Sequence, residues 1–258
     1  PDEDPSASAE SALLCLEMGD YEGATQHIDA ASIRGEGAVV PYVRGNIAAN
    51  QGHLKSALSH YNEAIEMEPT HVRARLNRAN IHMASENAQA ALDDANILLE
   101  LAPKLGYAKL RRAEANMLLS NWEDARKDLE TIIEGAPHHH YALTKLASCY
   151  ISMGRPEKAE APLNEALRLE PNHTDAWHHR GLLYLDWGRE EEAINDFEAA
   201  IRCDGSHIDA RLHIAAIHHE AKRFDEASTA WSGVLAINPD HTVARIRREE
   251  CEIALATI

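Results

Sequence analysis

The 258-residue chain has few aromatic residues and an excess of negative charge. Phe, Trp and Tyr make up only 5% of it, whereas 45% of its residues are hydrophobic, so we expect a folded core built from aliphatic side chains and exclude disorder throughout. The 42 acidic residues outnumber the 25 basic ones and give a formal net charge of -17. Because this field repels phosphate backbones and anionic lipids, nucleic acid and membrane surfaces are not expected partners.

The sequence also lacks long apolar runs and closely spaced cysteines. No run reaches the roughly 18 to 20 residues that cross a bilayer, so no direct membrane insertion is expected, and no signal peptide is recognised. Without CxxC spacing, the four cysteines are expected to be reduced packing residues, which favours a cytoplasmic location. A periplasmic or membrane-anchored location stays open, because the chain begins at Pro1 without an initiator Met and a targeting segment upstream would be trimmed. These cysteines are Cys15, Cys149, Cys203 and Cys251.

Small residues recur along the chain at a nearly constant step. A second small residue lies twelve positions before each recurring alanine, and a usually large apolar residue lies four positions after it. Small side chains let two helices cross closely, and the large residue fills the space beside the crossing. Glycines five positions before four of the alanines are expected to take a left-handed conformation between paired helices. The recurring alanines are Ala24, Ala57, Ala91, Ala125, Ala159, Ala193 and Ala227.

This pattern resembles the tetratricopeptide repeat family, whose unit is a 34-residue helix–turn–helix. The clearest copy consists of Trp177, Gly181, Tyr184, Gly188, Ala193, Phe197 and Ala200. The resemblance implies an all-α, right-handed superhelical solenoid of antiparallel helix pairs. It places an acidic tail at 1–4, seven repeats at 5–37, 38–71, 72–105, 106–139, 140–173, 174–207 and 208–241, and a capping helix at 242–258.

The third and fifth repeats depart from the pattern inside their helix pairs. The third has Glu86 and Asn87 where the glycine between the helices belongs. In the fifth, Pro162 is predicted to fall inside the second helix and bend it, because proline removes a backbone donor.

No catalytic, cofactor or metal motif is apparent. The sequence has no HExxH, phosphate-binding glycine loop or nucleophile elbow, so we expect no enzyme activity and no cofactor. Its 16 histidines include adjacent runs, but adjacent helical residues point about 100° apart, whereas a zinc pair on a helix needs ligands at i and i+4. Five histidines share one repeat position and are interpreted as turn residues, so that replacing His139 should have almost no effect. They are His71, His139, His173, His207 and His241.

The resemblance also implies a peptide-binding groove along the first helices of the repeats. Asparagine amides both donate and accept hydrogen bonds, tyrosines give amphipathic contact area, and arginine binds carboxylates bidentately. This composition predicts an extended ligand that is acidic or ends in a carboxylate, with Arg111 making the strongest contact. The predicted groove residues are Tyr42, Asn46, Arg73, Asn77, Asn80, Tyr107, Arg111, Tyr141 and Lys145.

The predicted function is therefore a non-enzymatic adaptor for protein–protein interaction. Two alternatives remain open at this point. One is a self-assembling scaffold, in which the end of one solenoid docks on another as a homo-oligomer. The other is the substrate-recruiting segment of a longer enzyme. The first helices of the later repeats are acidic and rich in histidine, which leaves room for a second, pH-sensitive contact.

Overall fold

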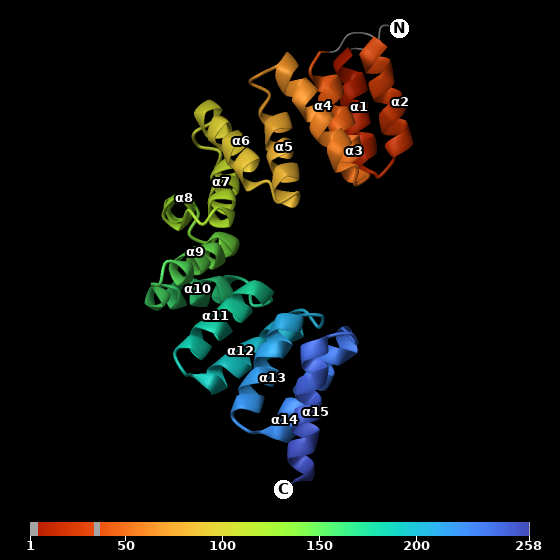
Figure 1. Ribbon diagram of the computed structural model, residues 1–258. Coiled ribbons are helices and arrows are strands. Elements are labelled where there is room, and N and C mark those ends of the chain that lie inside the picture. The colour runs from red at the N-terminus through yellow and green to blue at the C-terminus, as the bar shows by residue number, and fades with distance from the viewer. Residues whose placement is uncertain (1–4, 34–36, 258) are drawn as a thin grey trace. The chain divides into compact units, whose positions relative to one another are not determined.

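The regular structure of this chain is helical. The computed structural model describes residues 5–33 and 37–257, and there it has fifteen α-helices, one 3-10 turn and no strand (Figure 1). This confirms the predicted all-α class of paired helices. The predicted tail at 1–4 lies outside the described residues, as do positions 34–36, at the joint after the first repeat.

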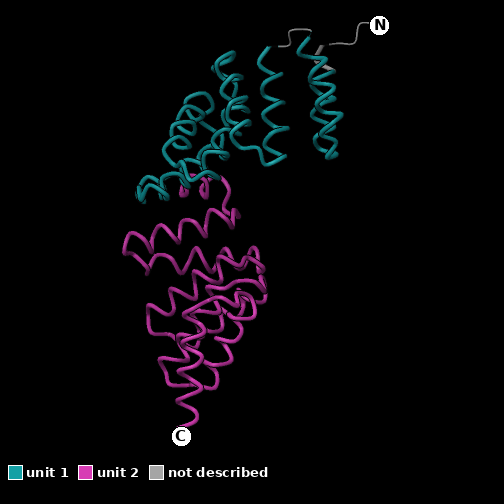
Figure 2. Tube along the Cα trace, turned by 45° about the vertical axis from the view of Figure 1, so that its right-hand side comes forward, with its two compact units in different colours: residues 1–128 teal, residues 129–258 magenta. Residues whose placement is uncertain are grey.

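The chain divides into two compact units, residues 1–128 and 129–258, each with its own helices (Figure 2). Seven helices belong to the first unit, and α8 (Trp122–Gly135) contains the boundary. The seven are α1 (Pro5–Glu17), α2 (Tyr21–Ile33), α3 (Val39–Asn50), α4 (Leu54–Met67), α5 (Val72–Ala84), α6 (Ala88–Leu101) and α7 (Gly106–Leu118).

The second unit continues the succession of short helices. No helix in the part of the chain that the structure describes is both long and apolar enough to cross a membrane. The elements after α8 are α9 (His140–Ser152), η1 (Pro156–Lys158), α10 (Glu160–Leu169), α11 (Thr174–Asp186), α12 (Glu190–Cys203), α13 (Ile208–Glu220), α14 (Phe224–Ile237) and α15 (Thr242–Ala256).

Small residues stand where paired helices cross, as predicted. A Cβ added to Gly45 on α3 would come within 2.5 Å of the Tyr61 ring, and one on Gly181 would come within 2.7 Å of the Phe197 ring. Both distances are shorter than carbon atoms tolerate, so these two positions require glycine. The recurring alanines, among them Ala193, are completely buried.

The turns inside the helix pairs use a left-handed residue. Gly19, Gly52, Gly154 and Gly188 take φ values from 69° to 77°, as predicted from their positions. Where glycine is missing, other residues adopt the same conformation at some steric cost, because a Cβ disfavours positive φ. They are Glu86 (φ 57°), Ser120 (φ 61°) and Lys222 (φ 58°).

Pro162 does not lie inside one continuous helix, as the prediction of a bend had assumed, because the second helix of this pair is interrupted just before it. The second helix of this pair opens with the 3-10 turn η1, and α10 begins only at Glu160. Pro162 therefore lies in the first turn of α10, where the backbone N–H would have no partner within the helix, so proline is accommodated there.

Candidate functional site

A hollow of about 550 Å³ opens in the first unit, lined by residues of α1, α3, α4 and α5. Five of the predicted groove residues line it, namely Tyr42, Asn46, Arg73, Asn77 and Asn80. Sequence reasoning missed the contribution of α1 and α4, because the groove prediction used the first helix of the second and later repeats only. The additional lining residues are Leu13, Leu16, Glu17, Ala49, Asn50, Tyr61 and Ile81.

Hydrogen bonds hold the asparagines of this hollow in place. The Oδ1 atom of Asn46 accepts from the Tyr61 hydroxyl at 2.9 Å and from Nδ2 of Asn77 at 2.8 Å. Burial raises the pKa of Tyr61 to about 12, although contact with the Asn77 side chain partly offsets the rise. The hydroxyl is therefore protonated and donates at neutral pH. This network links α3, α4 and α5 and fixes the positions of the two amides.

Within the described residues, two further polar groups of the hollow, on Asn80 and Arg73, have no internal partner. Among the described residues, the buried Oδ1 atom of Asn80 accepts no hydrogen bond. Arg73 is exposed and forms no ion pair within that same part of the chain, while Glu17 contributes one carboxylate from α1. A buried acceptor without a donor costs free energy, so a ligand N–H at this point would be favourable.

Tyr42 belongs to the floor of the hollow. It is buried, and its ring centroid lies 4.9 Å from that of His71 and 6.4 Å from that of Tyr61. As a lining residue, it gives apolar contact area beside the amides.

Arg111 and Tyr107, on α7, are engaged with each other and with a carboxylate. The Arg111 guanidinium lies 4.6 Å over the Tyr107 ring, donates to the Tyr107 hydroxyl at 2.6 Å and forms an ion pair with Glu114. Since Glu114 is buried, this pair is well shielded from water. The arrangement differs from the expectation that Arg111 is available for the strongest ligand contact, because its charge is already compensated.

The last two predicted residues belong to the second unit. Tyr141 and Lys145 are on α9, where Nζ of Lys145 lies 4.9 Å over the Tyr141 ring.

The repeated histidines cap helices, a role that the interpretation as plain turn residues omits. At four of the five positions, Nδ1 accepts a hydrogen bond from the backbone N–H three residues later, at 3.1 to 3.2 Å. These are His71, His139, His207 and His241. His173 instead places Nε2 3.2 Å from the Thr144 hydroxyl.

The second unit also gathers aromatic rings around His178. Its ring centroid lies 4.8 Å from that of His207, 5.5 Å from that of His213 and 5.7 Å from that of Phe197. Burial, reinforced by the neighbouring histidines, lowers the pKa of His178 to about 4. Within the described ranges, no group of three or more His, Cys, Asp and Glu side chains is arranged to hold a metal ion.

The cysteines are free, and Cys149 and Cys251 are completely buried, as predicted for packing residues. The Cys251 thiol lies 3.3 Å from Nδ1 of His219. Burial raises the pKa of that thiol, so the pair does not produce a reactive thiolate.

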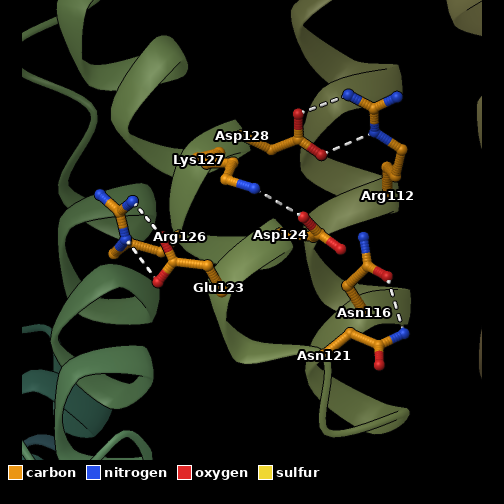
Figure 3. Close-up of polar contacts among 8 residues, drawn as sticks. All are labelled: Arg112, Asn116, Asn121, Glu123, Asp124, Arg126, Lys127 and Asp128. Atoms are coloured by element: carbon orange, nitrogen blue, oxygen red, sulfur yellow. Dashed lines mark hydrogen bonds and ion pairs between the residues drawn. The ribbon is translucent and has the colours of Figure 1, made fainter.

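A recurring arginine clamp was also missed by sequence reasoning. Arg112 on α7 donates to both carboxylate oxygens of Asp128 on α8, at 2.7 and 2.6 Å (Figure 3). It also donates to Asn96 of the preceding pair at 3.4 Å. The available signal was an arginine recurring at multiples of 34 residues, with asparagine 16 positions before it and aspartate 16 positions after it. The other complete clamps are Asn62–Arg78–Asp94 and Asn164–Arg180–Asp196.

Three sequence profiles of one family match the chain, all described as tetratricopeptide repeat. They cover residues 42–105, 116–182 and 174–207. Among curated proteins, no sequence matches.

Several solved structures share the fold at low sequence identity. A tetratricopeptide repeat protein from Parabacteroides merdae ATCC 43184 is 19% identical, with a TM-score of 0.74 over 96% of this chain and 98% of that one. The C-terminal part of a TPR repeat-containing protein from Cytophaga hutchinsonii is 14% identical, with a TM-score of 0.67 over 93% and 98%.

A third structure is that of YrrB, whose printed description is a TPR protein with an unusual peptide-binding site. It is 21% identical, with a TM-score of 0.54 over 73% of this chain and 97% of that one. Repeats of this kind are generally modules of protein–protein interaction and are typically non-enzymatic. The three profiles, together with the paired helices that these solved structures share, show that the chain belongs to the tetratricopeptide repeat family.

Proposed function

We propose that the hollow of the first unit binds an extended segment of a partner protein that is acidic or ends in a carboxylate, and that the chain acts as a non-enzymatic adaptor. The observation that carries the proposal is the unpartnered, buried Oδ1 atom of Asn80 beside the prearranged amides of Asn46 and Asn77. The fold neighbour YrrB, described as having a peptide-binding site, supports it by analogy.

An extended peptide offers what these groups need. Its backbone N–H donates to acceptors such as Oδ1 of Asn80, and its carbonyl accepts from side-chain amides. The apolar wall formed by Leu13, Leu16 and Ile81 covers an apolar ligand side chain. Because Asn46 and Asn77 are already fixed by hydrogen bonds, binding costs little side-chain entropy.

Arg73 supplies the charge preference of the hollow. It is the exposed cation among the lining residues, and a charge-assisted bond to a carboxylate is stronger than a neutral one. Arg111 has a secondary role in the proposal, because a ligand carboxylate would compete with Glu114 for it. Tyr107, on α7 of the same unit, is proposed as a contact for a longer ligand. Tyr141 and Lys145 are proposed as ligand contacts within the second unit.

Peptide binding can be tested with a library of acid-ended peptides displayed on an array, followed by titration of the best binder. Asn77→Ala and Arg73→Ala should each weaken this peptide about tenfold, corresponding to roughly 1.4 kcal/mol. Asn195→Ala and Lys55→Ala, at exposed positions outside the hollow, are the matched controls and should leave the affinity unchanged. Equal affinity of all four folded variants for the peptide would show that the peptide does not bind in this hollow.

Self-assembly is a second candidate function, favoured by exposed apolar residues on the last helix. Val243, Ile246 and Ile253 of α15 are 55%, 50% and 66% exposed. Light scattering of the purified chain tests it. A concentration-dependent dimer that Ile246→Glu abolishes would support assembly through α15, whereas a monomer at all concentrations would exclude it.

A further inference from the structure

The second unit contains a groove of about 630 Å³ formed by residues of α12, α13 and α14. Ile201, Ile214 and Ala230 give it an apolar floor, and carboxylates surround it at Glu198, Asp225 and Glu226. None of these residues belongs to the hollow described above.

One repeat earlier, the corresponding space is filled by an arginine. Arg180 donates to both oxygens of Asp196, at 2.7 and 2.8 Å, and to Asn164 at 2.7 Å. Its guanidinium lies 4.8 Å from the ring centre of Trp177 and 5.6 Å from that of Tyr184. Two hydrogen bonds to a carboxylate, one hydrogen bond to a side-chain amide and two aromatic rings thus enclose this cation.

Every part of that arrangement is replaced 34 residues later, and every replacement lines the groove. The central cation is lost, its carboxylate partner becomes a methyl group and its amide partner becomes a carboxylate. The substitutions are Ile214 for Arg180, Ala230 for Asp196, Glu198 for Asn164, Arg211 for Trp177 and His218 for Tyr184. The groove is therefore the space that an arginine and its aromatic neighbours occupy in the preceding pair.

The groups that remain favour a positive occupant. Glu198, Asp225 and Glu226 are exposed carboxylates, and Nδ1 of His218 is buried without a hydrogen-bond partner among the described residues. Burial lowers the pKa of His218, so its ring is neutral at pH 7 and one nitrogen can accept a hydrogen bond.

The two arginines of the groove leave the carboxylates in excess. Arg211 donates to the Gly205 carbonyl at 3.0 Å, and Arg202 lies 3.8 Å from Glu198 in an exposed pair. Exposed pairs of this kind contribute little, so Glu198 can exchange this partner for a better enclosed one.

We propose that this groove receives an arginine side chain from a partner protein, which takes the place of the arginine that the chain itself supplies in the preceding pair. The aliphatic stem lies on Ile214 and Ala230, and the guanidinium donates to Glu198 and to the neighbouring acceptors. Long basic side chains suit such a site because their stems bury apolar area while their heads make charge-assisted bonds. This surface is additional to the peptide-binding hollow proposed for the first unit and does not depend on it.

The test uses N-acetyl-arginine amide as the probe and N-acetyl-citrulline amide as its uncharged analogue. Titrations are followed by NMR through the backbone amides of Ile214 and Ala230. We expect saturable shifts with the arginine probe and at least fivefold weaker binding of citrulline. No shift at these amides, or equal affinity for both probes, would overturn the proposal.

Two variants separate the groove from general charge effects. The triple change Ile214→Arg, Ala230→Asp and Glu198→Asn rebuilds the clamp within the chain and should abolish probe binding. Should this variant fail to fold, Glu198→Gln alone still tests the proposal, since it should weaken the arginine probe at least threefold. Glu191→Gln, an exposed position on the same helix, is the matched control and should bind like wild type. Wild-type affinity in the rebuilt or Glu198→Gln protein would contradict the proposal.

Discussion

In this chain a histidine just before a helix serves as its N-cap, a position usually occupied by serine, threonine, aspartate or asparagine. The first backbone N–H groups of a helix have no partner within the helix, and a side-chain acceptor at the N-cap stabilises them. Nδ1 of His139 accepts from the N–H of Ala142 at 3.2 Å. Neutral imidazole is an acceptor at one nitrogen only, so the cap also fixes the tautomer.

Replacing His139 by alanine should therefore lower the free energy of unfolding by about 0.5–1 kcal/mol, because the cap of α9 is lost. Urea denaturation measures the change. His138→Ala, at the exposed neighbouring position, is the matched control and should stay within about 0.5 kcal/mol of wild type. Indistinguishable midpoints for the two variants would show that the cap contributes nothing.

His178 makes stability depend on pH. Its pKa is about 4 in the folded chain, compared with the ordinary 6.5, so the unfolded chain binds a proton there more readily than the folded chain does. The contribution of His178 is complete above pH 6.5 and is lost as the pH falls toward 4. We expect the free energy of unfolding to decrease over this interval, and His178→Phe to reduce the decrease.

An NMR titration of the imidazole resonances checks the cause directly. The His178 ring should remain neutral at pH 5. A midpoint near 6.5, or an unchanged pH dependence in His178→Phe, would exclude this explanation.

Pairs of helices are held together by more than apolar packing. The Arg112–Asp128 pair joins α7 to α8 through two short hydrogen bonds (Figure 3). The Asp128 side chain is 8% exposed. On the same helix Lys127 and Asp124, 60% and 66% exposed, form an ion pair at 3.0 Å. Removing one partner of a buried pair leaves an uncompensated charge, whereas an exposed pair contributes little.

Asp128→Ala should accordingly cost about 1–3 kcal/mol of stability, and Asp124→Ala less than about 0.5 kcal/mol. Both remove one carboxylate from α8, which makes them matched variants for thermal and urea denaturation. Equal losses in the two proteins would show that burial of the clamp does not matter.

The sequence was sufficient to predict helix pairing because the crossing positions admit few residue types. A Cβ added at Gly45 or Gly181 would lie against an aromatic ring. Small residues therefore recur at this repeat position, with a period that is visible without a structure. The groove was predicted less completely. Compensation of Arg111 by Glu114 depends on side-chain conformation, and the contribution of Tyr61 depends on how a neighbouring helix packs. Periodicity carries neither kind of information.

At the scale of the whole chain, the stability of a repeat protein is approximately the sum of the intrinsic stability of each repeat and the interaction energy at each interface between neighbouring repeats. These interfaces are unequal within the first unit. Arg44 joins α3 to α2 by a single bond of 2.9 Å to Asp29, with both side chains at least 36% exposed. Arg78, in contrast, makes a two-bond pair with the buried Asp94 and also donates to Asn62 of the preceding pair.

Hydrogen exchange should therefore show α1 and α2 opening before α5 and α6, because the first pair has one neighbour and a weakly joined interface. Opening of an end repeat leaves the remaining interfaces intact, so protection should rise along the first unit instead of being uniform. Mass spectrometry of peptides from 8–33 and 72–101, measured on the same sample, compares the two pairs. Equal protection factors for them would mean that the first unit opens as one cooperative block, and that the clamps add no local stability.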